Sequence, residues 1–454
     1  MRIATIKSVI WFLIIMLIAF AFPLQVLLLS PLPSLFPYLL VMLILILDAF
    51  TGSRFFSWNI KKPLDLFITI YVILVLFQTS WQTIFGFVSL DACIRAIVIY
   101  LLPVFFYIYF RNGLTEKEIR SILFSVALCG LIIGCYFYYE SILKLFLGQL
   151  TEYSIKAHEY TIAVSDLSLE EANPARIGVN YRGMGLLEKH AASAAWIIFG
   201  CFAALSLLPR RAIFKRVVVL SIYGTMILFG LNFTGIFGFT LLVFLIEFDG
   251  YYVLHGIIYR KNILKLIFAF SIVMLILIVN FFLLSFESIE IIQRIFTTQF
   301  DIISGNITLR DDNLSFFEGF LHELFAYHEN IYKFPLAIIL GQGFAKGFAV
   351  YSIGGDYGFV ETLHTFGLPL FISITFGLIS LILKAIHQIF YFDKINENYS
   401  RYMKFALSIS IYILFSEIHY SIWRMKSVLP ILFIAMSIFS YYSFKRVPDE
   451  TEKT

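Results

Sequence analysis

The chain has 454 residues, of which 60% are hydrophobic and only 14% are charged. A soluble domain carries roughly a quarter charged residues, so this composition excludes a soluble fold and predicts an integral membrane protein. The net charge of +4 at pH 7 does not indicate nucleic-acid binding, because the basic residues lie mostly in short loops, where membrane topology accounts for them.

Apolar runs long enough to cross a bilayer recur along the whole chain. A spanning helix needs about 20 apolar residues, and about twelve such runs predict an all-α integral membrane protein with one polytopic domain over residues 1–454. Only Asn232 and Phe233 separate the seventh and eighth runs, which can form a hairpin or one broken helix. The predicted spans are 9–29, 33–50, 64–80, 92–110, 121–146, 190–208, 213–231, 234–248, 264–284, 359–384, 403–419 and 427–444.

The distribution of Lys and Arg predicts the orientation of the chain. Basic residues concentrate near both termini and in every second loop, as at Arg210 and Arg211. The positive-inside rule then predicts that both termini are cytoplasmic. It also assigns two long segments, 148–189 and 285–358, to the outer face. Loops of that length inside a compact protein usually carry function.

The first outer segment ends with polar residues at the start of a membrane span. Arg182 and Gly185 are followed by His190, and then by the small residues 191–195. Small residues allow helices to pack closely in a bilayer, so we expect His190 to be a polar group inside the helix bundle. It can serve catalysis or substrate contact there, or form an interior hydrogen bond.

The second outer segment combines charged, aromatic and glycine-rich stretches. Arg310 stands before Asp311 and Asp312, and the aromatic run 314–328 follows. The apolar side chains of this run have helical spacing, which predicts a helix lying at the membrane interface. A glycine-rich turn at 341–343 comes next. The segment ends in membrane span ten, and the polar residues at that boundary are Asp356, Glu361 and His364.

The order of these signals resembles the O-antigen polymerase and ligase family of polytopic glycosyltransferases. The matching parts are an Arg before an aromatic helix, G-x-G-[FY], D-x-G and the first glycine of G-x-x-G. The chain departs from the family at Leu370, where the last motif has its second glycine, and it lacks the Ser/Thr–Arg pair expected near Phe233. The residues that carry the resemblance are Arg310, Gly341, Gly343, Phe344, Asp356, Gly358 and Gly367.

The resemblance implies a polymerase that joins polyprenyl-diphosphate-linked oligosaccharide repeat units on the outer face of the bacterial inner membrane. The alternative within the family is the ligase, which transfers the polysaccharide to the lipid A core. The implied reaction is metal-independent and inverts the anomeric carbon. It needs no cofactor, and a chain-length regulator protein is a candidate partner.

The residues of the outer segments suit such a reaction. Arg182 and Arg310 are candidate cations for the diphosphates, because arginine offers permanently charged, bidentate donors. A sugar hydroxyl that attacks the donor can need a carboxylate or a neutral histidine as its base. The candidates for the general base, or for a group that positions the substrate, are Glu188, His190, Asp311, Asp312, Asp356, Glu361 and His364.

Each of these residues also has a plainer interpretation. Arg310 can form a surface ion pair with its neighbouring aspartates, and Asp356 can cap the helix that follows it. Arg424 is interpreted as a topological or headgroup contact. No metal site is predicted, since D-x-D and zinc-peptidase spacing are both missing from the sequence.

A transporter or flippase is the rival from another class. It predicts charged residues near the bilayer midplane and paired broken helices. Apart from Glu140 and Lys144, the charged residues gather in loops and at span ends, which favours the enzyme.

Overall fold

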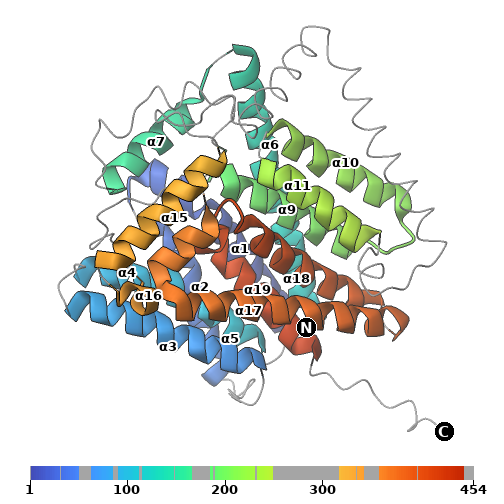
Figure 1. Cartoon of the computed structure of the whole chain (residues 1–454). Helices are drawn as coiled ribbons and strands as arrows, with labels where there is room; N and C mark the ends of the chain where they lie inside the picture. The colour runs from blue at the N-terminus through green and yellow to red at the C-terminus, as the bar shows by residue number, and fades with distance from the viewer. Residues whose placement is uncertain are drawn as a thin grey trace.

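The computed structural model describes residues 2–30, 32–50, 63–84, 90–111, 115–147, 149–165, 185–187, 190–230, 233–248, 316–333, 335–341, 357–395 and 397–443. These residues form helices and contain no strand (Figure 1). Five of the helices are long and apolar enough to cross a membrane: Lys7–Leu28, Leu64–Trp81, Glu116–Lys144, His190–Leu207 and Gly358–Ile389. A helical membrane protein is therefore confirmed as the fold class.

Twelve spans stay a prediction, and one of them, 264–284, lies outside the described residues. The predicted span 92–110 consists of two helices that are separated at Leu102 and Pro103. Proline interrupts a helix because it lacks an N–H donor and its ring clashes with the preceding turn. The helices of the first part are α1 (Arg2–Leu28), η1 (Leu32–Ser34), α2 (Phe36–Phe50), α3 (Pro63–Ile84), α4 (Leu90–Leu101), α5 (Val104–Arg111) and α6 (Glu116–Leu147).

The second part of the chain completes the bundle around α9. The helices are α7 (Glu152–Ser165), α9 (His190–Leu207), α10 (Ile213–Phe229), α11 (Phe233–Leu242), η2 (Val243–Glu247), α15 (Phe316–Lys333), α16 (Ala337–Leu340), α17 (Gly358–Ile395), α18 (Glu397–Ser416), η3 (Ile422–Arg424) and α19 (Leu429–Ser443). The aromatic run of the sequence thus forms a helix, α15, as predicted. Its location at the membrane interface stays a prediction.

Helix α9 lies in the interior of the bundle, as its small residues predicted. Residues 191–195 are all buried. Its closest neighbour is α6, and the two backbones meet at Gly130 and Gly200. A Cβ atom on Gly130 would lie 2.5 Å from the Trp196 carbonyl oxygen, so a larger residue would force the helices apart.

Helices α10 and α11 form a hairpin, which decides between the two alternatives left open by the sequence. A Cβ atom on Gly224 would lie 3.3 Å from the Phe239 ring. Arg216, at the start of α10, donates to Glu247, at the end of η2, at 2.7 and 2.5 Å. One broken helix would place these two charged residues at opposite ends.

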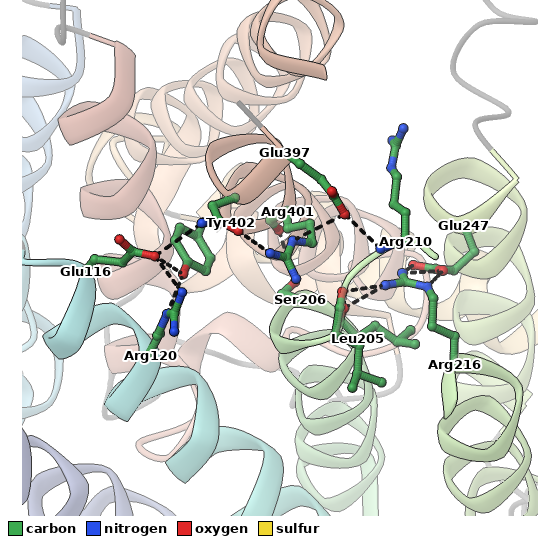
Figure 2. A network of polar contacts seen from close by, with 12 residues as sticks. Glu116, Arg120, Leu205, Ser206, Arg210, Arg216, Glu247, Glu397, Arg401 and Tyr402 are labelled. Carbon is green, nitrogen blue, oxygen red and sulfur yellow. Dashed lines mark hydrogen bonds and ion pairs between the residues drawn. The ribbon is translucent and has the colours of Figure 1, made fainter. Parts of the chain in front are cut away.

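Several helix ends meet in a polar network at one end of the bundle (Figure 2). Arg120 of α6 donates to Tyr402 of α18 at 3.3 Å, and the Arg210 backbone N–H donates to Glu397 at 2.8 Å. The network joins the start of α6, the end of α9, the starts of α10 and α18, and the end of η2. The basic-residue pattern assigns these loops to one side, and that this side is cytoplasmic stays a prediction.

Helix α17 is broken at Gly367, where φ is +74° and ψ is 171°. The end of α16 packs into this break. A Cβ atom on Gly341, whose φ is +65°, would lie 2.4 Å from the Thr365 carbonyl oxygen. A Cβ atom on Gly367 would lie 2.4 Å from the Ile339 carbonyl oxygen. Only glycine combines a positive φ with such a close backbone approach.

Candidate functional site

The connection between α18 and α19 organises the other end of the bundle, opposite the network of Figure 2. The start of α17 is fixed against it. The Phe359 backbone N–H donates to the Glu417 carbonyl oxygen at 2.9 Å. A Cβ atom on Gly358 would lie 2.6 Å from the Ser421 backbone nitrogen. This close contact explains the glycine of the D-x-G motif, because any side chain would push α17 off the connection.

An ion pair between Glu361 and Arg424 lies at this junction. Arg424 Nη1 is 2.7 Å from Glu361 Oε1, and the two side chains are 17% and 27% exposed. The guanidinium carbon also lies 5.4 Å from the centre of the Phe366 ring, within the range of a cation–π contact. The pair is therefore largely enclosed by protein but still reachable from outside.

Arg424 keeps its charge in this position. It stands between two predicted spans, at the end of η3. Burial by itself lowers the pKa of its guanidinium, but Glu361 and Tyr100 outweigh burial and raise the pKa above its ordinary value. A guanidinium that stays charged is a fixed cation for an anionic group.

A second carboxylate, Glu417, lies beside the ion pair. Thr362 donates to Glu417 Oε2 at 2.9 Å and shares a hydrogen bond of 2.7 Å with Ser421. Glu417 Oε1 is buried and accepts no hydrogen bond from the part of the chain that the structure describes.

Two histidines flank this centre. His190, the first residue of α9, places its ring 5.2 Å from Tyr420, edge to face. His364 lies one helical turn beyond Glu361 and is 6% exposed. Its ring is 6.2 Å from Tyr327 of α15. His364 therefore shares α17 with Glu361, and His190 contacts Tyr420 in the connection that also carries Arg424.

The structure brings together some predicted residues and does not describe others. His190, Glu361 and His364 lie at the same end of the bundle. Outside the described residues lie the predictions Arg182, Glu188, Arg310, Asp311, Asp312 and Asp356.

Arg424 has a contact that the sequence did not indicate. It pairs with Glu361, and its role as a topological or headgroup contact stays a prediction. Its closeness in sequence to Lys426 favoured that interpretation, and no local pattern links it to a carboxylate 63 positions earlier. The one signal in the sequence was an arginine next to Trp423, in a short polar connection between two apolar spans.

The first of the two long segments, 148–189, is also anchored near this end. Gly185 has φ +79°, and its N–H donates to Glu140 Oε2 at 2.6 Å. Ser154 also donates to the Glu140 carboxylate, and Tyr153 donates to the Leu186 carbonyl oxygen at 2.7 Å. Glu140 therefore acts as an internal anchor for the chain just before His190.

No protein-family model matches the chain, and neither the search of curated proteins nor that of solved structures finds a similar protein. The resemblance of its motifs to the polymerase and ligase family thus stays a prediction. Within the described ranges, no three His, Cys, Asp or Glu side chains stand close enough together to hold a metal ion.

Proposed function

We propose that this protein is a membrane glycosyltransferase that joins polyprenyl-diphosphate-linked oligosaccharide units. The observation that carries the proposal is Arg424, a permanently charged guanidinium that is enclosed by protein at one end of a membrane bundle. Glu361 pairs with it, and His190 and His364 lie at the same end of the bundle, where an attacking sugar hydroxyl can need a base. The motif resemblance supports the same reaction class and adds Arg182 and Arg310 as further cations.

The roles follow from the chemistry of each group. Arg424 stabilises the negative charge that develops on the departing diphosphate. His364, or alternatively His190, accepts the proton of the attacking sugar hydroxyl, since a neutral imidazole is a base near neutral pH. Glu361 positions Arg424. The released proton and the lipid diphosphate both leave towards the outer face, which is the side predicted from the basic residues.

A pair of histidine variants tests this assignment. His364→Ala should reduce the rate of polymer formation by about a hundredfold, in the range of general-base catalysis. His328→Ala is the matched control, because this histidine of α15 is largely exposed, and it should leave the rate unchanged. The assay measures polymer by gel electrophoresis with purified protein and lipid-linked repeat units. Equal rates for both variants would remove His364 from the mechanism.

The acceptor distinguishes polymerase from ligase. A polymerase uses a second lipid-linked repeat unit as the acceptor, and a ligase uses the lipid A core. We favour the polymerase on the motif order of the sequence. A product that forms only when lipid A core is added would identify the ligase.

One observation favours a transporter as the second candidate. The break between α4 and α5 lies beside the break in α17, because the Tyr100 and Phe366 rings are 5.3 Å apart. Transporters build substrate sites from such discontinuous helices. Movement of a fluorescent lipid-linked sugar across liposomes, with no new glycosidic bond, would favour this candidate.

A further inference from the structure

The segment α15–α16 reaches deep below the outer end of the bundle. Gly341 contacts the backbone at Gly367, nine residues from the start of α17. At 1.5 Å per residue this is about 13 Å along the helix. On the other side, Gln78 of α3 donates to the Leu340 carbonyl oxygen at 3.0 Å. Gln78 lies six residues before the end of α3, or roughly 9 Å along it.

The backbone of this segment is suited to such a depth. In a bilayer, each polar backbone group needs a partner inside the protein. Leu340, the last residue of α16, has its carbonyl oxygen bound by Gln78. The Ile338 and Ile339 N–H groups donate within the turn, at 3.2 and 3.0 Å. The buried side chain of Gln78 in α3 thus provides the hydrogen-bond donor for the last carbonyl oxygen of α16.

The surface of α16 is apolar. Leu336 and Ile339 are each 56% exposed, and Ile338 is 38% exposed. On α15, Leu321 and Phe325 are exposed and lie one turn apart. Ala326 of the same helix packs against Tyr357 and Val360 at the start of α17. Figure 1 shows α16 beside α3, to which the hydrogen bond from Gln78 joins it. In water such a surface would be unfavourable, and in a bilayer it faces hydrocarbon.

The exposed apolar face of α16 lies close to the site at Arg424. Gly341 meets the backbone of the buried Phe366, and the Phe366 ring contacts Arg424, so a single residue separates the end of α16 from the cation. An exposed apolar face beside a fixed cation suits an amphiphile with a hydrocarbon chain and an anionic head. A lipid diphosphate has this chemistry.

We propose that α16 enters the outer half of the membrane as a re-entrant element. Its exposed apolar face holds the polyprenyl chain of the lipid-linked substrate whose diphosphate binds at Arg424. This inference rests on the proposed function for the identity of the lipid, and it adds the place where the substrate enters from the bilayer.

Photo-cross-linking tests the inference. A benzophenone amino acid replaces Ile339, and a second variant carries it at Leu383 as the matched control. Leu383 is 63% exposed on the far half of α17. Each protein is reconstituted in vesicles of phosphatidylethanolamine, phosphatidylglycerol and lipid-linked repeat units, irradiated, and analysed by mass spectrometry. The position 339 variant should capture the polyprenyl lipid, and the position 383 variant should capture phospholipid.

Two outcomes would overturn the inference. Capture of phospholipid alone at both positions would show that α16 faces bulk lipid, and capture of no lipid at position 339 would show that α16 does not enter the membrane. Either result in a protein that still forms polymer refutes the inference and leaves the proposed function intact. A native protein that forms no polymer refutes the proposed function separately.

A kinetic variant provides the second measurement. Ile339→Asn should raise the KM for the lipid-linked unit about tenfold, the effect of losing most of one buried apolar side chain. It should leave kcat unchanged, because the chain binds equally in the ground state and the transition state. Leu383→Asn should change neither constant. Equal KM values for the two variants would contradict the inference.

Discussion

Replacing Arg424 should separate its catalytic role from its structural role. Arg424→Ala removes the cation and leaves the Glu361 and Glu417 carboxylates without it. A charge-assisted contact contributes about 1.5–3 kcal/mol. If that contact stabilises the departing diphosphate, its loss lowers the rate by about ten- to a hundredfold. Arg424→Lys should retain part of the rate, since an ammonium keeps the charge but not the bidentate geometry.

The stability of the same variant has to be measured beside its activity. Removing one partner of an enclosed ion pair costs about 3–5 kcal/mol when the other charge stays buried. Both side chains here are partly exposed, so we expect a smaller loss. The double variant Glu361→Gln, Arg424→Gln removes both charges, and its thermal midpoint should lie above that of Arg424→Ala.

The double variant decides between the two roles. A structural ion pair predicts that activity returns with stability, whereas a catalytic cation predicts that the stable double variant stays inactive. The assay is polymer formation by purified protein, with thermal unfolding measured in the same detergent. Arg120→Ala is the control, because its ion pair with Glu116 is exposed, its other partner Tyr402 lies at the opposite end of the bundle from Arg424, and exposed pairs contribute about 0–1 kcal/mol. A double variant with native activity would refute the reasoning.

Three further predictions follow from the sequence and the fold. The Arg182→Ala, Arg310→Ala double variant should nearly abolish polymer while the protein stays inserted and abundant; normal long-chain polymer in cells would exclude both arginines from the site. Gly341→Ala should lower the thermal midpoint, because it forces φ +65° on a residue with a Cβ at a cost of about 1–3 kcal/mol, whereas Gly224→Ala meets only the side chain of Phe239, at 3.3 Å, and should lower it less. A reporter fused after Gly305 should be active only outside the cytoplasm; activity of a cytoplasmic reporter there would reverse the topology.

The helical architecture could be predicted from the sequence because hydrophobic runs are a local signal. Each run of about 20 apolar residues can satisfy its own backbone only as a helix, whatever its neighbours are. The burial of α9 was likewise predictable from its small residues. The hairpin of α10 and α11 was not, because it depends on a contact between Arg216 and Glu247 across 31 positions.

The site was predictable only in part, because it also depends on contacts between residues that are distant along the chain. The motif glycines 341 and 367 were recognisable, but the sequence does not show that they meet each other. Their spacing therefore indicated a family pattern. The physical reason for the two glycines, the close backbone contact between α16 and α17, became visible only in the structure. The pairing of Arg424 with Glu361 was not predictable, because the two residues are distant along the chain.

One measurement tests the central claim most directly. Purified protein is mixed with a single lipid-linked repeat unit, and both the glycan products and the free polyprenyl diphosphate are measured over time. A polymerase predicts a ladder of products, with one polyprenyl diphosphate released for each new glycosidic bond. If a folded protein leaves all of the lipid-linked unit unreacted, with no ladder and no released diphosphate, the result would contradict the account.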